Sequence, residues 1–277
     1  RPSLMPALDL PIRKAIYAHG RMLITEGKMS KSKGTVVYPE MLIERYGLDS
    51  VRYYLMKTMP FGGDYVFTPE DFVQRMTSDL SNDLGNLLNR TIAMINKYRE
   101  GHVPKYASLV TDYDSELSTT AANIIGKYYK HMDEMEFSAA LSEVWQLITR
   151  ANKYIDETTP WILAKDTEKA AELDSVLVHL AESLRIVAVL LQPFMTKASY
   201  DIFRQLGLPA VETSINGLRF GEFPEGTTVI KQGEPIFPRV DQDVEVQYIQ
   251  KQMAHPDGRP VTSKWDPEET VLLSRKE

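Results

Sequence analysis

The sequence predicts a mainly α-helical protein, with strands, a loop and short helices first, then a bundle of long helices, then an irregular C-terminal extension. Two observations support this fold class. Apolar residues recur at helical spacing from residue 72 to residue 206, with short connections between the helical stretches. Glycine and proline are dense between residues 221 and 238, and no period is sustained after residue 244. We therefore divide the chain into residues 1–66, 67–207 and 208–277.

The N-terminal segment begins with a predicted strand pair over residues 12–26. Apolar side chains alternate on both sides of His19-Gly20, as half-buried strands require. The alternating residues are Ile16, Ala18, Met22 and Ile24. Residues 27–34 are polar, basic and bracketed by glycines, which predicts a mobile loop.

Two short helices and a linker complete this segment. A helix over residues 39–46 is expected, because a proline opens it and a glycine follows it. A second helix is expected over residues 50–57, with Asp49 as its N-cap. The turn-rich residues 60–64 then lead into the helical part of the chain.

The first long helix has a strong start signal. Thr68 is the predicted N-cap, Pro69 occupies the first helical position, and two acidic residues follow in the first turn. Apolar residues then recur with a helical period. They are Phe72, Met76, Leu80, Leu84, Leu87, Leu88, Ile92 and Ile95.

Four more helices are predicted from the same periodicity, over residues 113–134, 137–157, 167–191 and 193–206. The second of them ends where Thr159-Pro160 interrupts the pattern, and the last ends at Gly207. Trp145 lies in mid-helix among apolar neighbours, which predicts a core position. From residue 244 the chain is polar and is expected to be either a strap over the body or a linker.

Composition limits the possible classes of protein. Of the 277 residues, 43% are hydrophobic and 25% are charged, as in ordinary globular proteins. The absence of cysteine excludes disulfides and thiolate metal sites. The five histidines are scattered, and we expect no zinc site in this chain. No apolar run approaches the roughly 20 residues of a membrane span, so a cytoplasmic protein without a membrane partner is expected.

Charge is distributed unevenly along the chain. The net charge is −6, which argues against a protein that coats nucleic acid indiscriminately. Residues 1–60 carry ten Lys/Arg and five Asp/Glu, a net of +5, whereas the remainder carries 22 basic and 33 acidic residues, a net of −11. A basic segment on an acidic body indicates a local site for an anion.

The sharpest chemical signal is a pentapeptide in the glycine-flanked loop, Lys28-Met29-Ser30-Lys31-Ser32. Its two lysines can place two ammonium groups around one polyphosphate, and its two serines offer hydroxyl donors. At about 4 Å and an effective dielectric near 20, each charge contact is worth on the order of 4 kcal/mol. For a generic Lys/Ser-rich pentapeptide, a solvated basic loop is the more frequent outcome.

A second group of candidate residues lies on the predicted helices. Asn86 and Arg90 are four residues apart and share a helix face nearly opposite the apolar stripe. An exposed amide beside a guanidinium can read base edges and stack on a base, although an ordinary solvated face is the alternative. Trp161 follows a helix break, where an indole can stay partly exposed as a stacking platform, although tryptophan is more often a core residue.

The pentapeptide has the form K-M-S-K-S, which is the second signature of class I aminoacyl-tRNA synthetases. Its surroundings resemble methionyl-tRNA synthetases over about residues 4–240, most closely in the first hundred residues. The matching runs are Ala18-His19-Gly20, Gly27 to Gly34, Tyr46-Gly47-Leu48-Asp49, Arg52-Tyr53-Tyr54-Leu55, Asp83 to Thr91, Ile95-Asn96-Lys97-Tyr98, Pro160-Trp161 and Phe237-Pro238-Arg239.

The resemblance implies a methionine–tRNA ligase that uses ATP with Mg²⁺ to form methionyl-adenylate and then charges tRNA(Met). All five residues of the pentapeptide would bind ATP, and Lys28 and Lys31 would stabilise charge on the α-phosphate and the leaving pyrophosphate. Asn86, Arg90 and Trp161 would bind the CAU anticodon. Residues 1–66 would end the Rossmann catalytic domain, and the bundle would be the anticodon-binding domain.

Several implications stay open. His19 lies either near the ATP ribose or phosphates, or only at the end of a strand. The family's His-x-Gly-His-type tetrad, methionine pocket and any zinc site are expected upstream of residue 1, so we expect a C-terminal portion that forms no adenylate alone. Another class I synthetase, of the leucine, isoleucine, valine or cysteine type, is one alternative. A truncated non-catalytic tRNA-binding protein is the other. The oligomeric state is open as well.

Overall fold

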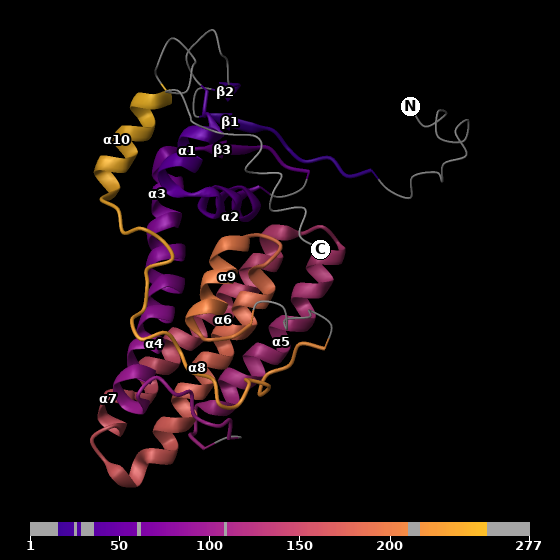
Figure 1. The fold of residues 1–277 in the computed structure, drawn as a ribbon. Helices are drawn as coiled ribbons and strands as arrows, with labels where there is room; N and C mark the ends of the chain where they lie inside the picture. The colour runs from indigo at the N-terminus through magenta and orange to yellow at the C-terminus, as the bar shows by residue number, and fades with distance from the viewer. Residues whose placement is uncertain are drawn as a thin grey trace.

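The computed structural model describes residues 16–24, 27–28, 36–59, 62–107, 110–209 and 217–253, with 27–28 described for their backbone only. A small sheet and the first short helices lie at one end of an elongated helical body (Figure 1). The predicted fold class is confirmed, because helices dominate the described residues and the long ones pack together as a bundle.

The sheet has three short strands in the order β2-β1-β3. Strand β1 (Met22–Ile24) runs antiparallel to β2 (Gly27–Lys28) and parallel to β3 (Tyr65–Phe67). A strand pair was predicted over residues 12–26, of which residues 12–15 lie outside the described residues. Met22–Ile24 do form a strand, but the predicted pairing across His19-Gly20 is wrong, because residues 16–18 form no strand and β1 pairs with β2 and β3. Gly20 instead allows a close backbone approach, since a Cβ there would lie 1.5 Å from the carbonyl oxygen of Gly63.

Helices α1 (Pro39–Tyr46) and α2 (Leu48–Thr58) follow as predicted, joined by Gly47 at φ 84°. The role predicted for Asp49 is wrong. Asp49 lies inside the first turn of α2, and its carboxylate accepts a 2.6 Å hydrogen bond from the backbone N–H of Ala198. Asp49 therefore caps the first turn of a helix that is distant in sequence, α9 (Thr196–Gln205).

The first long helix is not uniform. It consists of α3 (Pro69–Arg75), a π-helix η4 (Met76–Gly85) and α4 (Asn86–Arg99). The predicted cap is confirmed, because the Thr68 hydroxyl accepts a 3.1 Å hydrogen bond from the N–H of Asp71.

The π-helix was not predicted, although the apolar spacing contains its signal. Six residues repeat at steps of four, and their exposed fractions lie between 0% and 3%: Phe72, Met76, Leu80, Leu84, Leu88 and Ile92. A step of four exceeds an α-helical turn by about 40°, so a regular α-helix would rotate this stripe away from the core. The wider π turns take up the extra residue and keep the stripe buried.

The bundle is built from α5 (Asp114–Asp133), α6 (Phe137–Thr158), α8 (Ala170–Leu191) and α9. Two short elements, α7 (Pro160–Leu163) and the 3₁₀ turn η5 (Thr167–Lys169), connect α6 to α8. The four predicted helices are confirmed within a few residues. Trp145 lies in the core as predicted, 8% exposed, with its ring 4.6 Å from that of Tyr53.

Helix α8 is the central helix, buried on all sides from Ser175 to Leu191. Two of its buried polar side chains, Glu182 and Arg185, form an ion pair. Glu182 binds Arg185 through hydrogen bonds of 2.7 and 2.8 Å and accepts the backbone N–H groups of Gly221 and Glu222. This buried carboxylate fixes the returning C-terminal segment against the bundle.

The chain after α9 runs back along the body and reaches the sheet end as α10 (Gln242–Met253), which packs on α3 (Figure 1). The sequence predicted no helix there. The apolar periodicity of α10 is weak because its only buried residues are Glu245 and Ile249. The carboxylate of Glu245 lies on the buried face, where an amphipathic helix usually has an apolar residue. None of the helices in the described part of the chain is long and apolar enough to cross a membrane.

Candidate nucleic-acid interface

Asn86 and Arg90 lie one turn apart at the start of α4 and are partly exposed. The next residues around the helix, Leu87 and Leu88, are fully buried. Because the backbone is α-helical from Asn86 onward, the predicted i, i+4 relationship between the amide and the guanidinium is present.

Arg90 links this face to the end of α6. Its Nη2 lies 3.1 Å from Oδ1 of Asp156, and the two side chains are 39% and 68% exposed. Such an exposed pair contributes about 0–1 kcal/mol. The guanidinium is therefore held near one position but can exchange Asp156 for another partner at small cost.

Trp161 lies just beyond the end of α6. Thr159 ends that helix at φ 43°, in the left-handed region, and Pro160 begins α7. This break leaves Trp161 43% exposed and its neighbour Ile162 55% exposed. Arg90 and Trp161 are thus both connected to the C-terminal end of α6. Arg90 contacts Asp156 near that end, and Trp161 follows the helix directly in the sequence.

The end of α6 also carries a second carboxylate, Glu157. Burial acts to raise the pKa of Glu157, but hydrogen bonds from Arg150 and Lys153 outweigh it and lower the pKa. Glu157 is therefore anionic near neutral pH.

Asn86 borders a groove of about 490 Å³ between the long helix and the returning C-terminal segment. From the helix side it is lined by Ser81, Gly85, Asn86 and Asn89, and from the other side by residues 235–239. Arg239 was not among the predicted site residues. Its Nη2 donates a 2.9 Å hydrogen bond to Oδ1 of Asn86, 153 residues away in sequence.

The second predicted site lies at the sheet end. Lys28 ends β2, where its backbone is opposite Leu23, but its side chain and residues 29–32 lie outside the described residues. The first two residues of the predicted loop, Gly27–Lys28, thus form a strand, and the side chains predicted to bind ATP lie outside the described residues. His19 is exposed, and its Nδ1 lies 2.7 Å from the carbonyl oxygen of Gly20.

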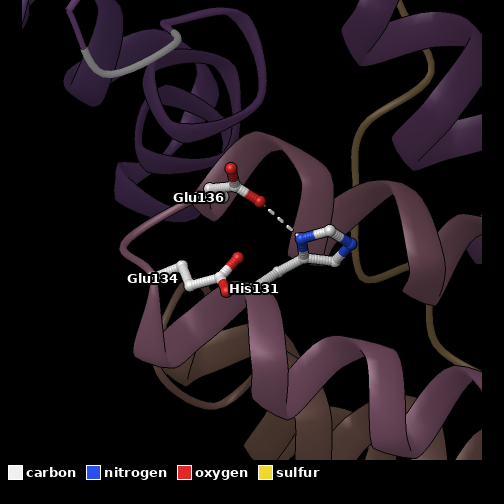
Figure 2. A group of neighbouring side chains, drawn as sticks. All are labelled: His131, Glu134 and Glu136. Carbon is white, nitrogen blue, oxygen red and sulfur yellow. Dashed lines mark hydrogen bonds and ion pairs between the residues drawn. The ribbon is translucent and has the colours of Figure 1, made fainter.

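One group of described side chains has the composition of a metal site, His131, Glu134 and Glu136, at the turn between α5 and α6 (Figure 2). Their ligand atoms lie within 4.8 Å of one another, and Nδ1 of His131 is 2.6 Å from Oε2 of Glu136. Both glutamates are exposed. We assign no ion here, because a hydrogen bond between His131 and Glu136 accounts for their contact.

Two family models match the chain. The model described as tRNA synthetases class I (M) matches residues 1–92, which include Asn86 and Arg90. The model described as the anticodon binding domain of methionyl tRNA ligase matches residues 103–255, which include Trp161.

Curated relatives and solved structures agree with these matches. The methionine–tRNA ligase of Enterococcus faecalis is 61% identical over 277 residues, and that of Oceanobacillus iheyensis is 58% identical over 282 residues. The chain is covered completely in both alignments but spans only 41% and 42% of these relatives.

The methionyl-tRNA synthetase of Mycobacterium tuberculosis has a similar structure. In complex with methionyl-adenylate it matches 86% of this chain and 47% of its own, with a TM-score of 0.78 and 33% identity. Its apo form matches 87% of this chain and 46% of its own, with a TM-score of 0.76 and 30% identity. Taken with the family model over residues 103–255, these findings show that the chain belongs to the methionyl-tRNA ligase family and carries its anticodon-binding domain.

Proposed function

We propose that this chain reads the CAU anticodon of tRNA(Met) with Asn86, Arg90 and Trp161. The observation that carries the proposal is the 43% exposed indole of Trp161 at the α6 end that Arg90 also contacts. Trp145, in the middle of α6, is by contrast a buried core residue that packs on Tyr53. An exposed tryptophan, a guanidinium and an amide together offer stacking and hydrogen bonding to unstacked bases.

Each of the three side chains supplies a different interaction. The indole of Trp161 stacks on a base, which is worth about 1–3 kcal/mol by alanine substitution. The guanidinium of Arg90 exchanges Asp156 for a base edge or a phosphate, and it can also stack. The amide of Asn86 hydrogen-bonds to a base edge at the groove.

The whole protein, in this proposal, is a methionine–tRNA ligase of the cytoplasm that activates methionine with ATP and Mg²⁺. Lys28, Met29, Ser30, Lys31 and Ser32 would bind the ATP phosphates. Support comes from the family match over residues 1–92 and from the methionyl-adenylate complex of a similar structure. In this proposal residues 1–66 are the ATP-handling segment, residues 67–207 the anticodon-binding bundle and residues 208–277 the C-terminal segment.

An RNA-binding experiment tests the anticodon proposal. Binding of this chain to a CAU anticodon stem-loop is compared with binding to stem-loops changed at each anticodon base, at one stated salt concentration. We expect Trp161→Ala to weaken binding about tenfold or more, because tenfold corresponds to about 1.4 kcal/mol. Arg90→Ala should weaken binding and also reduce the dependence on salt, if the guanidinium contacts a phosphate.

Matched controls separate recognition from folding. Tyr200 is an aromatic residue on α9 that is 54% exposed, so Tyr200→Ala controls for loss of an exposed ring. Arg99 lies on the same helix as Arg90 and pairs with Asp174, so Arg99→Ala controls for loss of a surface ion pair. If the Trp161 and Arg90 variants bind as their controls do, the anticodon assignment is wrong.

A further inference from the structure

The C-terminal segment forms one wall of the groove beside Asn86. Residues 235–239 face the end of η4 and the start of α4 across a groove of about 490 Å³. Pockets of a few hundred Å³ commonly hold small ligands or single ligand groups. The groove is therefore large enough to receive a base that is turned out of a loop.

Side chains of the bundle hold this wall in place. Gln205 donates from Nε2 to the carbonyl oxygen of Glu234 at 2.8 Å and accepts the N–H of the same residue at 3.0 Å. Asn96 donates a 2.8 Å hydrogen bond to the carbonyl oxygen of Ile230. At Gly233 the backbone passes so close that a Cβ would lie 3.2 Å from Oδ1 of Asn89. The segment that carries Arg239 is thus anchored before any ligand binds.

The Arg239–Asn86 hydrogen bond determines which end of the amide points outward. Arg239 donates from Nη2 to Oδ1 of Asn86 at 2.9 Å. A guanidinium has only donors, so it can pair with the amide oxygen but not with the amide NH₂. The chemistry of the pair therefore fixes an orientation that the shape of an amide alone leaves ambiguous. The NH₂ group of Asn86 is left to act on a ligand.

We propose that Arg239 is a positioning residue that makes Asn86 a hydrogen-bond donor toward an anticodon base. In this arrangement Asn86 selects a base that presents a ring nitrogen or a carbonyl oxygen at the groove, and it rejects one that presents an amino group there. The inference rests on the proposed function, because it assigns the sense of hydrogen bonding within the same anticodon site. The inference also makes the C-terminal segment part of the anticodon-binding site, because Arg239 belongs to that segment.

Three substitutions at one position test this inference. Arg239→Lys keeps a donor, so selectivity among stem-loops changed at each anticodon base should stay within about threefold of the wild type. Arg239→Met frees the amide to rotate, and selectivity at one anticodon position should fall about tenfold, which is one hydrogen bond of about 1.4 kcal/mol. Arg239→Glu accepts from the NH₂ group and turns the oxygen outward, so preference at that position should shift toward bases that present an amino group.

Two further variants complete the design. Asn86→Asp keeps the pairing with Arg239 but has no donor, so it should lose the same selectivity as Arg239→Met. Arg204→Met removes another arginine that contacts this segment, through Glu234, and should leave selectivity unchanged. Because selectivity is a ratio of affinities, a uniform change in affinity caused by net charge cancels.

A second readout follows the amide directly. The side-chain NH₂ resonances of Asn86, assigned from their absence in Asn86→Asp, should shift in Arg239→Met and Arg239→Glu but stay near the wild-type positions in Arg239→Lys. If the wild type itself does not distinguish anticodons, the proposed function fails, and the inference fails with it. If the wild type distinguishes them and Asn86→Ala does not, while Arg239→Met still does, only the inference is overturned.

Discussion

Glu245 on α10 holds the guanidinium of Arg45 on α1 through hydrogen bonds of 2.6 and 2.8 Å. The same carboxylate accepts a 2.6 Å hydrogen bond from the hydroxyl of Tyr46, and the Arg45 guanidinium lies 3.9 Å from the ring centre of Tyr248. Hydrogen bonding from Arg45 keeps the pKa of Glu245 below its usual range. The C-terminal helix is thereby clamped to the helix that follows the predicted ATP loop.

Replacing Glu245 should release this clamp. In Glu245→Gln the amide NH₂ meets the donors of Arg45, so we expect the free energy of unfolding to fall by about 2 kcal/mol. Urea denaturation measures the loss, and hydrogen exchange should accelerate in α10 more than in the bundle. Glu225→Gln is the control, because the side chains of Glu225 and its partner Lys105 are 66% and 76% exposed. This substitution should change the free energy of unfolding by less than about 0.5 kcal/mol. Unchanged exchange in α10 would show that the clamp does not hold the helix.

Lowering the pH should reduce the free energy of unfolding through Asp114, a residue that is 0% exposed. Burial acts to raise its pKa, but hydrogen bonds from Thr111, Tyr154 and Val110 outweigh it and lower the pKa to about 2. The pKa of Asp114 is thus lower in the folded protein than the unfolded value of 3.8. The contribution of Asp114 to the free energy of unfolding is therefore complete above pH 3.8 and is lost as the pH falls toward 2.

The contribution of Asp114 is on the order of 2 kcal/mol. Asp114→Asn removes the titration and should also destabilise the fold at neutral pH, because an NH₂ group then faces backbone donors. The difference in unfolding free energy between wild type and Asp114→Asn, measured in urea from pH 6 down to pH 3, should therefore shrink as the pH falls. A difference that is constant over this range would contradict the assignment.

The cap that Asp49 provides to α9 predicts opposite outcomes for two substitutions. Burial raises the pKa of Asp49, so its charge is held at a cost even though Oδ2 accepts the N–H of Ala198. Asp49→Asn keeps an acceptor without the charge and should change the free energy of unfolding by less than about 0.5 kcal/mol. Asp49→Ala removes the acceptor and should cost about 1 kcal/mol. Thermal or urea unfolding distinguishes the two, and equal losses would show that the charge matters more than the cap.

Gly20 should tolerate no side chain. In Gly20→Ala the new Cβ would lie 1.5 Å from the carbonyl oxygen of Gly63, so the start of β1 has to move away from the turn before β3. We expect a loss of about 1–3 kcal/mol and faster hydrogen exchange in β1 and β3. Gly126→Ala is the control, because that glycine lies in α5 with nothing within 4 Å of the Cβ position, and it should be neutral or slightly stabilising. Similar results for the two variants would refute the close approach.

Local patterns in the sequence predicted the parts of the fold that depend on neighbouring residues. The Thr68 cap, the break at Thr159 and the end at Gly207 all follow from preferences of single residues for particular backbone angles, and the structure confirms them. The apolar periodicity predicted the long helices. The position of Trp145 within a helix predicted a buried indole, and the position of Trp161 after a helix break predicted an exposed one. The predicted roles of Asn86, Arg90 and Trp161 in binding RNA stay predictions.

The sequence by itself thus determined where the long helices run and which family the chain resembles, because periodicity, caps and motifs are properties of contiguous residues. Only the tertiary structure decided that Asp49 caps α9, that Glu245 holds Arg45, and that Arg239 fixes the amide of Asn86. Each of these contacts joins residues more than a hundred positions apart in the chain. Their partners are set by how the C-terminal segment and the helices pack, and no local spacing encodes that packing.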